Sequence, residues 1–433
     1  MKYKLLTFLG TGDYIHGYIV WKEGGSRRAY PFVQMGILEF FREKYGDEPL
    51  KVVVFLTEEA KKENWERAKG DYEGLKWHLE ELGKDMLRWI DVDLRMIEVP
   101  RGEEALWELF ETINGTLEEN DRVIFDITHA FRFFPVLTLL VLNYARFVKK
   151  VEIIHIFYCA AEVLGTRKEI EALPLEERKY PLFDFAPMAI LLDWTYAIEK
   201  FLETGNADAI RKIVDKDENL KALARETEGE KGKNLQKLAE FLHSFSMHVY
   251  TCRGPELPSR IKMVKEYVAL AKKEIELLPV MKPLVEKIEE RFSEIAKKKG
   301  ILQELEIVKW CYEKGLIQQG YTLLRESLVN YILRCIPGSP LLDKTARDNA
   351  ERILNAESMP PVSIPHLEEI RKIWRSVGDM RNDINHGGMR SKNRNSPDTL
   401  MKNLQMFALR IIEILGGEEN TEEEKDKNSI LGS

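Results

Sequence analysis

Short apolar runs alternate with amphipathic helical patterns over about the first 185 residues of the chain. The apolar runs are typical of buried strands and lie at residues 4–9, 52–56, 94–99, 123–127 and 151–157. Segments with helical periodicity lie between them, at residues 32–45, 71–89, 103–118 and 131–148. Strands that are apolar on both faces need helices on both sides of their sheet. The sequence therefore predicts a doubly wound, mostly parallel, Rossmann-like α/β sheet.

The strand pattern ends near Pro187, and helical periodicity continues from there. We expect the α/β domain to cover residues 1–186, a helical connecting region to cover 187–300, and an all-α bundle to cover 301–416. The final segment, 417–433, is polar and acidic and has few side chains to bury. Its composition predicts disorder.

A glycine-rich turn follows the first predicted strand and reads Gly10-Thr11-Gly12-Asp13-Tyr14. At the carboxyl end of a parallel strand, such glycines let backbone amides approach a phosphate closely. The turn also matches the first half of a dinucleotide-binding fingerprint, although Ile15 stands where a third glycine is required. Residues 15–30, with two adjacent glycines at their centre, predict a hairpin inserted after the strand. A tight turn without a ligand stays open as the alternative.

A second polar turn follows the predicted strand at 123–127 and reads Asp126-Ile127-Thr128-His129-Ala130-Phe131-Arg132. Thr128, His129 and Arg132 can all donate hydrogen bonds to an anion. Because they crowd at the carboxyl end of a strand, the sequence predicts a ligand site here. The alternative reading is local, with Thr128 or His129 capping the next helix and Asp126 satisfied at the strand end.

A third motif lies near the C-terminus and reads Arg381-Asn382-Asp383-Ile384-Asn385-His386-Gly387-Gly388. Histidine titrates near neutrality and can transfer a proton, and arginine can bind a phosphate with two hydrogen bonds. Five residues separate Arg381 from His386, which places them about 140° apart on an ideal helix. The two glycines can end the helix, so that His386 could turn toward Arg381 or toward a partner subunit.

The charge around this motif suits RNA. Residues 371–394 hold seven basic and two acidic side chains, a net charge of +5, whereas the whole chain carries −7. RNA brings its own nucleophile, the 2′-hydroxyl, so cleavage needs only a proton carrier and a positive clamp. We expect His386 and Arg381 to supply these, with Asn382 as a polar neighbour and no metal ion. A solvated basic helix end is the alternative.

The composition also indicates a compartment. The cysteines are scattered, without a Cys-x-x-Cys pair, and lie at Cys159, Cys252, Cys311 and Cys335. Neither a disulfide framework nor a structural zinc site is expected from that spacing. The chain enters a strand-like run directly rather than a signal sequence, and the longest apolar run, 136–142, is too short to cross a bilayer. We expect a cytoplasmic protein that does not associate with membranes.

The first two turns together resemble the CARF domain of CRISPR-associated proteins, through Leu9-Gly10-Thr11-Gly12 and through Asp126 to Arg132. With Arg381 and His386 downstream, the whole chain resembles a CARF–HEPN ribonuclease of the type III CRISPR ancillary class. The Asp-x-Thr-His-x-Phe-Arg string is the more specific motif, and the Arg-x4-His string gains weight from its position. The resemblance covers nearly the full length.

This resemblance implies a sensor joined to an effector. The CARF-like domain would form a homodimer and bind a cyclic oligoadenylate, with four adenylates as the family-based expectation. The residues implied in binding are Gly10, Thr11, Gly12, Asp13, Tyr14, Thr128, His129 and Arg132. The HEPN-like bundle would act as a metal-independent endoribonuclease on single-stranded RNA, using Arg381, Asn382 and His386 and leaving 2′,3′-cyclic phosphate ends. Some relatives also cut their own activator in the CARF pocket.

Two other functions stay open. The Gly10-x-Gly12 turn and the parallel sheet would also suit a nucleotide-dependent oxidoreductase, although the second predicted strand ends at Thr57-Glu58 without a well-placed acid. A ligand-sensing regulator, whose C-terminal bundle binds RNA or a partner without cutting, would use the same two sites.

Overall fold

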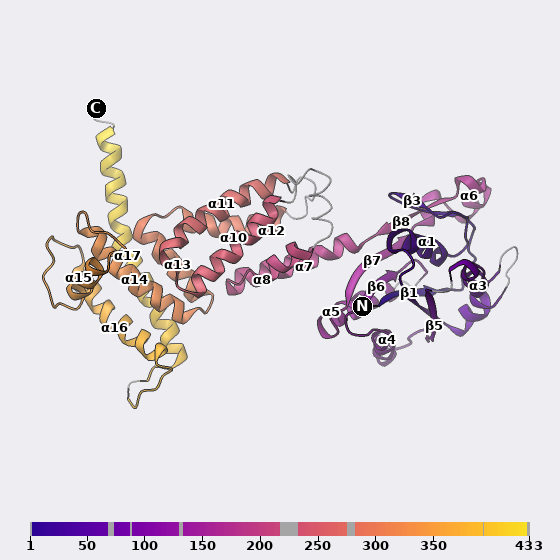
Figure 1. Ribbon diagram of the computed structural model, residues 1–433, viewed down its shortest axis with the longest axis horizontal. Coiled ribbons are helices and arrows are strands. Elements are labelled where there is room, and N and C mark those ends of the chain that lie inside the picture. Colours follow the sequence, from indigo (N-terminus) through magenta and orange to yellow (C-terminus); the bar gives the residue numbers. More distant parts are fainter. Residues whose placement is uncertain are drawn as a thin grey trace. The chain divides into compact units, whose positions relative to one another are not determined.

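The computed structural model describes residues 2–67, 73–86, 89–129, 133–216, 233–274, 282–392 and 394–430. Contacts within the chain divide it into two compact units, Met1–Ile190 and Leu191–Ser433 (Figure 1). The first unit holds a mostly parallel sheet with helices, and the second is helical throughout its described residues. The predicted fold class, an α/β sheet followed by an all-α region, is confirmed.

The first unit is built on one eight-stranded sheet with the order β3-β2-β8-β7-β6-β1-β4-β5. The strands are β1 (Tyr3–Leu9), β2 (Tyr18–Trp21), β3 (Gly24–Gly25), β4 (Leu50–Leu56), β5 (Ile90–Met96), β6 (Arg122–Asp126), β7 (Glu152–Cys159) and β8 (Lys179–Asp184). The strands from β7 to β5 run parallel, whereas β8 is antiparallel to β7. The predicted hairpin is formed by β2 and β3 and extends the sheet beside β8.

Helices cover both faces of this sheet. The main ones are α1 (Val33–Tyr45), α3 (Leu75–Met86), α4 (Glu103–Gly115) and α5 (Phe134–Val148). Leu5 and Leu9 of β1 belong to a core with α1 and α3, whereas Leu6 and Phe8 belong to a second core with α4 and α5. Because successive residues of β1 are buried on opposite faces, the strand reads as one continuous apolar run.

Some elements differ from the prediction. β5 covers Ile90–Met96, whereas the expected strand was 94–99. Its first apolar residues alternate with Asp91 and Asp93, as suits a strand at the sheet edge, so no continuous apolar run marks its beginning. β8 was not predicted, and its interior Pro181 explains why, since proline is depleted from strands. A short π-helix, Lys61–Trp65, follows β4 and was also not predicted.

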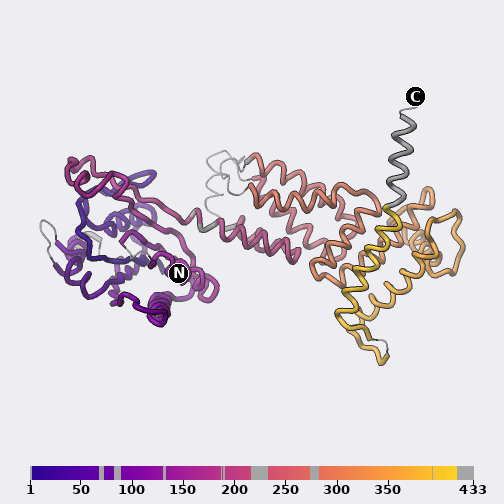
Figure 2. Tube along the Cα trace, turned by 180° about the vertical axis from the view of Figure 1, so that it is seen from behind, coloured from indigo at the N-terminus to yellow at the C-terminus, as the bar shows by residue number. Residues whose placement is uncertain are grey.

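The second unit contains the remaining helices, and Figure 2 follows their path. They are α7 (Ala186–Thr204), α8 (Asp208–Lys216), α10 (Lys233–Tyr250), α11 (Leu257–Glu274), α12 (Lys282–Ala296), α13 (Gly300–Glu313), α14 (Ile317–Cys335), α15 (Lys344–Leu354), α16 (Leu367–Asn385) and α17 (Pro397–Ile430). α7 begins in the first unit and continues into the second.

Trp310 of α13 lies in the core of the second unit. Its ring contacts Phe201 of α7, Phe245 of α10 and Phe292 of α12, with centroid distances of 5.7, 5.6 and 5.7 Å. Helices on both sides of residue 300 therefore share one aromatic core, and Trp310 is a packing residue.

The last helix extends past the predicted bundle. α17 continues to Ile430, through residues for which the polar composition predicts disorder. Lys and Glu are frequent there, and both have high intrinsic helix propensity. A prediction of disorder that rests only on the lack of apolar side chains does not take this propensity into account. Residues 431–433 lie outside the described part of the chain.

Candidate ligand and nucleic-acid sites

The two predicted N-terminal turns lie at the switch point of the sheet. β1 pairs with β4 on one side and with β6 on the other, so the chain changes direction between β1 and β6. The turn after β1 carries Gly10 to Tyr14, and the turn after β6 carries Thr128 and His129. In open α/β sheets, ligands bind outside the carboxyl ends of the strands at this point.

Buried hydrogen bonds join β1 to β6 just below these turns. The Thr7 hydroxyl donates to Asp126 Oδ2 at 2.6 Å, and Gln34 Nε2 of α1 donates to Thr7 Oγ1 at 2.9 Å. Asp126 Oδ1 accepts from the Thr128 backbone N–H at 2.9 Å. Burial raises the pKa of the Asp126 carboxyl, and the hydrogen bonds from Thr128 and Thr7 oppose that shift. Asp126 thus shapes the second turn from within the protein.

A buried asparagine holds the glycine turn in place. Asn64, in the π-helix after β4, is fully buried and donates through Nδ2 to the carbonyl oxygens of Gly10 at 2.7 Å and Gly12 at 2.9 Å. With both carbonyls turned toward Asn64, the turn is fixed from its inner side. Thr11, between the two glycines, is exposed and free to face a ligand.

Tyr14 folds back over its own turn. Its hydroxyl accepts from the Gly10 N–H at 3.1 Å, and its ring lies 4.2 Å from the His129 ring, centroid to centroid. A methyl group added to Gly10 would lie 3.1 Å from Tyr14 Oη and 3.2 Å from the His129 carbonyl oxygen. The two turns are therefore in close contact, and a side chain at Gly10 would crowd them.

His129 is held neutral. Desolvation lowers the pKa of its imidazole to about 4, although the residue as a whole is only half-buried. Its Nε2 is shielded from solvent and has no hydrogen-bond partner in the described part of the chain. At neutral pH, His129 can offer a ligand a hydrogen bond but no positive charge.

The other predicted ligand residues divide into three cases. Thr128 accepts the backbone N–H of Cys159 at 3.0 Å through Oγ1, and its side chain also hydrogen-bonds to the Asp126 carboxyl. Asp13 is bound by Arg167 of the helix α6 (Arg167–Ala172), which donates to its carbonyl oxygen at 2.8 Å and to Oδ2 at 3.3 Å. Arg132 lies outside the described residues.

Asn64 and Arg167 are the site-forming residues that the sequence did not reveal. Asn64 lies more than fifty residues from its partners, in a π-helix without a recognisable pattern. Arg167 follows β7 and reaches Asp13 across 154 positions of sequence. No motif spacing signals either contact.

The C-terminal motif ends α16 with ordered hydrogen bonds. His386 is the residue after the helix, and its N–H donates to the Asn382 carbonyl at 3.0 Å. Gly387 and Gly388 follow with φ of 62° and 68°, and the Gly388 N–H donates to the Asp383 carbonyl at 2.8 Å. Left-handed glycines of this kind terminate helices, so the predicted stop is confirmed.

Arg381 and His386 leave this helix in different directions. Arg381 is half-buried, and its Nε is shielded from solvent and has no hydrogen-bond partner among the described residues. Burial raises the pKa of the Cys252 thiol, just beyond α10, and the charge of Arg381 opposes that shift. His386 and Asn382 are exposed. The helix remains regular up to Asn385, so the angle of about 140° between positions 381 and 386 persists. Within one chain, α16 does not present the two side chains on one face.

Several of the basic side chains around the motif already have partners. Arg390 binds Asp379 Oδ1 at 2.8 Å and lies 3.8 Å from Asp383 Oδ1. The backbone N–H of Asn395 lowers the pKa of the buried Asp383. Arg381, by contrast, forms no ion pair with any residue in the described ranges, which leaves its charge available to a phosphate.

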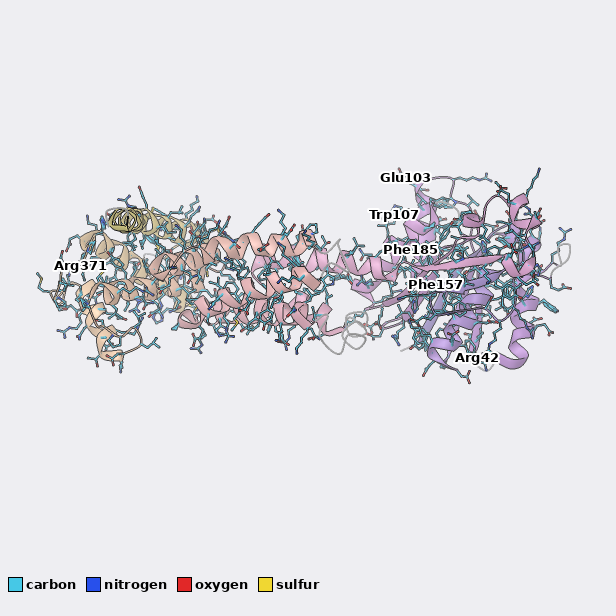
Figure 3. All side chains as sticks on the ribbon, turned by 90° about the horizontal axis from the view of Figure 1, so that it is seen from above. Arg42, Glu103, Trp107, Phe157, Phe185 and Arg371 are labelled. Carbon is cyan, nitrogen blue, oxygen red and sulfur yellow. The ribbon has the colours of Figure 1, made fainter. Side chains whose placement is uncertain are left out.

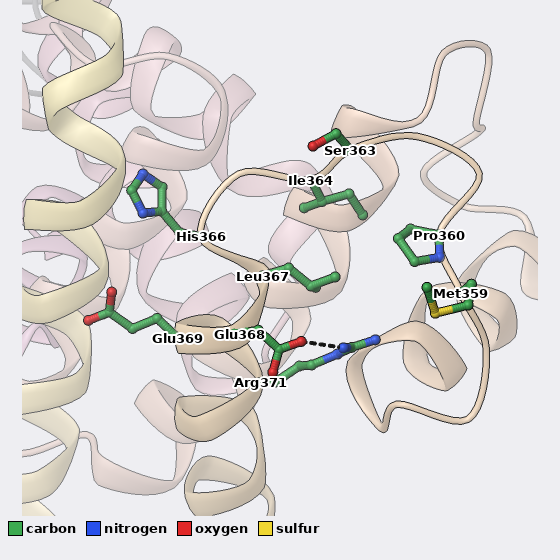
Figure 4. Close-up of a pocket in the computed structure, with 9 residues that line it drawn as sticks. All are labelled: Met359, Pro360, Ser363, Ile364, His366, Leu367, Glu368, Glu369 and Arg371. Carbon is green, nitrogen blue, oxygen red and sulfur yellow. Dashed lines mark hydrogen bonds and ion pairs between the residues drawn. The ribbon is translucent and has the colours of Figure 1, made fainter.

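A pocket of about 580 Å³ lies elsewhere in the second unit, at the start of α16 (Figure 4). It is lined by Met359, Pro360, Ser363, Ile364, His366, Leu367, Glu368, Glu369 and Arg371. The guanidinium of Arg371 is held by Glu368 at 2.6 Å and by the Ile353 carbonyl. The predicted catalytic residues do not line this pocket.

The described residues form neither a metal-binding cluster nor a membrane-spanning helix. Across the described ranges, no group of three or more His, Cys, Asp and Glu side chains is placed to hold a metal ion. None of the helices in those ranges combines the length and the apolar character that crossing a bilayer requires.

Comparison with known proteins gives a match to one domain family and a distant relative. The family model described as CRISPR-associated protein MJ1674, second domain, matches residues 190–300. CRISPR-associated protein MJ1674 of Methanocaldococcus jannaschii is 20% identical over 241 residues, which cover 54% of this chain and 33% of that protein. The chain thus spans about a third of the length of this relative. It is distantly related to a CRISPR-associated protein, and its middle helices are the part that matches the family model.

Proposed function

We propose that this chain is a CRISPR-associated, metal-independent endoribonuclease that cleaves single-stranded RNA when a cyclic oligoadenylate binds its N-terminal unit. One observation carries the proposal most: the Gly10 turn and the His129 turn meet at the switch point of the sheet, in a chain related to a CRISPR-associated protein. A ligand that carries phosphates suits this place, because open α/β sheets bind such ligands outside the carboxyl ends of their strands at the switch point.

The expected homodimer is supported by an exposed apolar surface in the first unit. We call it the α4–α5 face, and its members are Leu106, Trp107, Val136, Leu139, Leu140, Tyr144, Phe147 and Val148. Phe147 is 89% exposed and Trp107 is 69% exposed. Figure 3 labels Trp107 among the side chains of the first unit. A cluster of this kind on a folded unit is typical of an interaction site.

A second copy of the chain is the partner that fits the α4–α5 face. α5 begins just after the turn that carries Thr128 and His129. A two-fold contact through α5 would therefore bring two copies of that turn toward one axis. Each chain offers one set of ligand residues, and two sets around an axis would match a cyclic, symmetric activator.

A dimer would also overcome the separation of Arg381 from His386 on α16. Because α16 directs the two side chains to different sides, a cleft between two chains could combine the arginine of one with the histidine of the other. The imidazole would then move the proton of the 2′-hydroxyl, and the guanidinium would stabilise charge on the attacked phosphate. Activator binding would favour this arrangement only by binding it more tightly than the inactive one.

A second function has one observation in its favour. Since a single chain keeps Arg381 and His386 apart, a ligand-sensing regulator that binds RNA without cutting it is also consistent with α16. An oxidoreductase has less support, because the Gly10 turn leads into β2 and not into a helix that could receive a pyrophosphate.

The test is a cleavage assay on the full-length chain. We expect a fluorescent single-stranded RNA to be cut when cyclic tetra-adenylate is added, both with and without EDTA, and to stay intact without the activator. RNA that is bound but never cut would favour the regulator. RNA that is neither bound nor cut would contradict both functions.

A further inference from the structure

A pocket in the middle helices has a strongly positive lining. It has a volume of about 450 Å³ and lies where α11, the end of α12 and the start of α13 meet. α12 packs against both α11 and α13, and Figure 2 follows this part of the chain in the second unit. Four of the nine lining residues are lysines: Lys262, Lys265, Lys298 and Lys299.

Nothing in the lining balances this charge. The five other residues that line the pocket are uncharged, and the first turn of α13 carries no acidic side chain. None of the four lysines forms an ion pair with another residue in the described ranges, whereas Lys272, on the same helix as Lys262, binds Glu289 at 2.6 Å. All four are exposed, so their ammonium groups can reach an incoming ligand.

The number and the spread of these lysines favour an extended polyanion over a small ligand. A single phosphate needs one or two positive partners, whereas four unpaired lysines on two separate segments suit several phosphates in succession. The lining contains no aromatic side chain on which a base could stack. Contacts would therefore be to the sugar–phosphate backbone and independent of sequence.

We propose that this lysine pocket binds the phosphate backbone of the RNA substrate, apart from the cleavage residues at the end of α16. This inference rests on the proposed function, which supplies RNA as the ligand. It gives a role to the segment 190–300, which matches the family model and contains much of the pocket. The same chain would hold RNA through the pocket and cut it elsewhere.

The experiment measures RNA affinity in a background that cannot cleave. A fluorescein-labelled single-stranded RNA is titrated with the His386→Ala chain, with and without the further changes K262Q, K265Q, K298Q and K299Q. The matched control carries K212Q, K282Q, K344Q and K402Q, which remove the same charge from exposed lysines without ion pairs in the described structure. Thermal melting of each variant checks that the fold is kept.

We expect the pocket variant to bind RNA at least about tenfold more weakly than the control at low salt. Each lost phosphate contact should lower the slope of log K against log salt by about 0.7, so the slope should fall by up to about 3. Equal affinity and equal slope for the two variants would overturn the inference.

Parallel cleavage assays on the wild-type chain separate the two proposals. If the wild type cuts RNA and the pocket variant binds as well as the control, the pocket inference alone fails. If the pocket variant loses affinity and the wild type never cuts, the proposed catalysis fails and the RNA contact stands. If the wild type does not bind RNA, both are wrong.

Discussion

In the N-terminal unit, residues far apart in the sequence meet in one place, whereas in the C-terminal unit two residues only five positions apart lie on different sides of a helix. The parallel sheet brings the turns after β1 and β6 to one edge, and Tyr14 and His129 meet there at 4.2 Å between ring centroids. The regular helix α16 keeps Arg381 and His386 about 140° apart. Topology therefore brings the first candidate site together within one chain, while the proposed cleavage site would need a second chain to complete it.

The largest expected effect concerns the incomplete C-terminal site. Replacing His386 by Ala should lower activated RNA cleavage by about 10²- to 10⁴-fold, because the group that moves the proton is lost. The measurement is the initial rate of cleavage with saturating cyclic tetra-adenylate.

His366→Asn is the matched control, since His366 lies directly before the first residue of α16, at the opposite end of the helix from His386. His366 has a left-handed backbone, with φ of 55°, which asparagine tolerates. Full activity in H386A, or an equal loss in H366N, would contradict the assignment of His386.

The next effect concerns the second chain that the proposed cleavage site would require. Changing Phe147 to Asp places a charge in the α4–α5 face, so we expect a chain of 50.4 kDa that no longer dimerises and no longer cuts RNA. Light scattering gives the mass, and the cleavage assay gives the activity. Leu342→Asp changes a residue of the second unit that is 75% exposed, and it should leave both unchanged. A wild-type monomer that cleaves RNA would contradict the proposal that cleavage needs two chains.

A smaller effect is expected where the first unit holds its own site together. Asn64→Ala removes two buried hydrogen bonds to the Gly10 and Gly12 carbonyls, which should cost about 1–3 kcal/mol. The activator concentration for half-maximal cleavage should then rise by about tenfold or more.

Arg167→Ala provides the comparison within the same turn. Its pair with Asp13 is half-exposed, so its loss should cost less than about 1 kcal/mol and raise that concentration by at most about fivefold. If the two variants raise the activator concentration for half-maximal cleavage equally, the buried hydrogen bonds of Asn64 are not what fixes the turn.

The smallest effect is a dependence of stability on pH. The folded protein lowers the pKa of His129 to about 4 from an ordinary value of 6.5, so the unfolded chain takes up a proton first as the pH falls. The stability from this group is complete above about pH 6.5 and is lost as the pH falls toward 4.

His129→Gln should therefore show a smaller fall in melting temperature between pH 7 and pH 5 than the wild type. His78 has a pKa lowered to about 4 by burial as well, and His78→Gln measures its separate contribution. The same fall in wild type and H129Q would mean that His129 is not desolvated.

The sequence predicted more of the sheet than of the sites. Continuous apolar runs identified β1, β4, β6 and β7, because helices on both faces bury most of their residues. Glycines 387 and 388 marked the end of α16, because only left-handed residues close a helix in that way. β8 was missed since Pro181 interrupts its pattern.

The contacts that fix the candidate sites were harder to foresee. Asn64 and Arg167 reach their partners through the tertiary fold, and no periodicity records such a contact. The separation of Arg381 from His386 could be foreseen, because it follows from five residues of a regular helix. How a second chain would complete that site depends on an interface that one sequence does not encode as a local pattern.

The chemistry of the cleaved RNA tests the central claim most directly. RNA cut by the full-length chain with cyclic tetra-adenylate and EDTA can be examined by mass spectrometry. If the substrate's own 2′-hydroxyl attacks the phosphate, the upstream fragment must end in a 2′,3′-cyclic phosphate. Fragments that end in a 3′-hydroxyl opposite a 5′-phosphate would contradict the account.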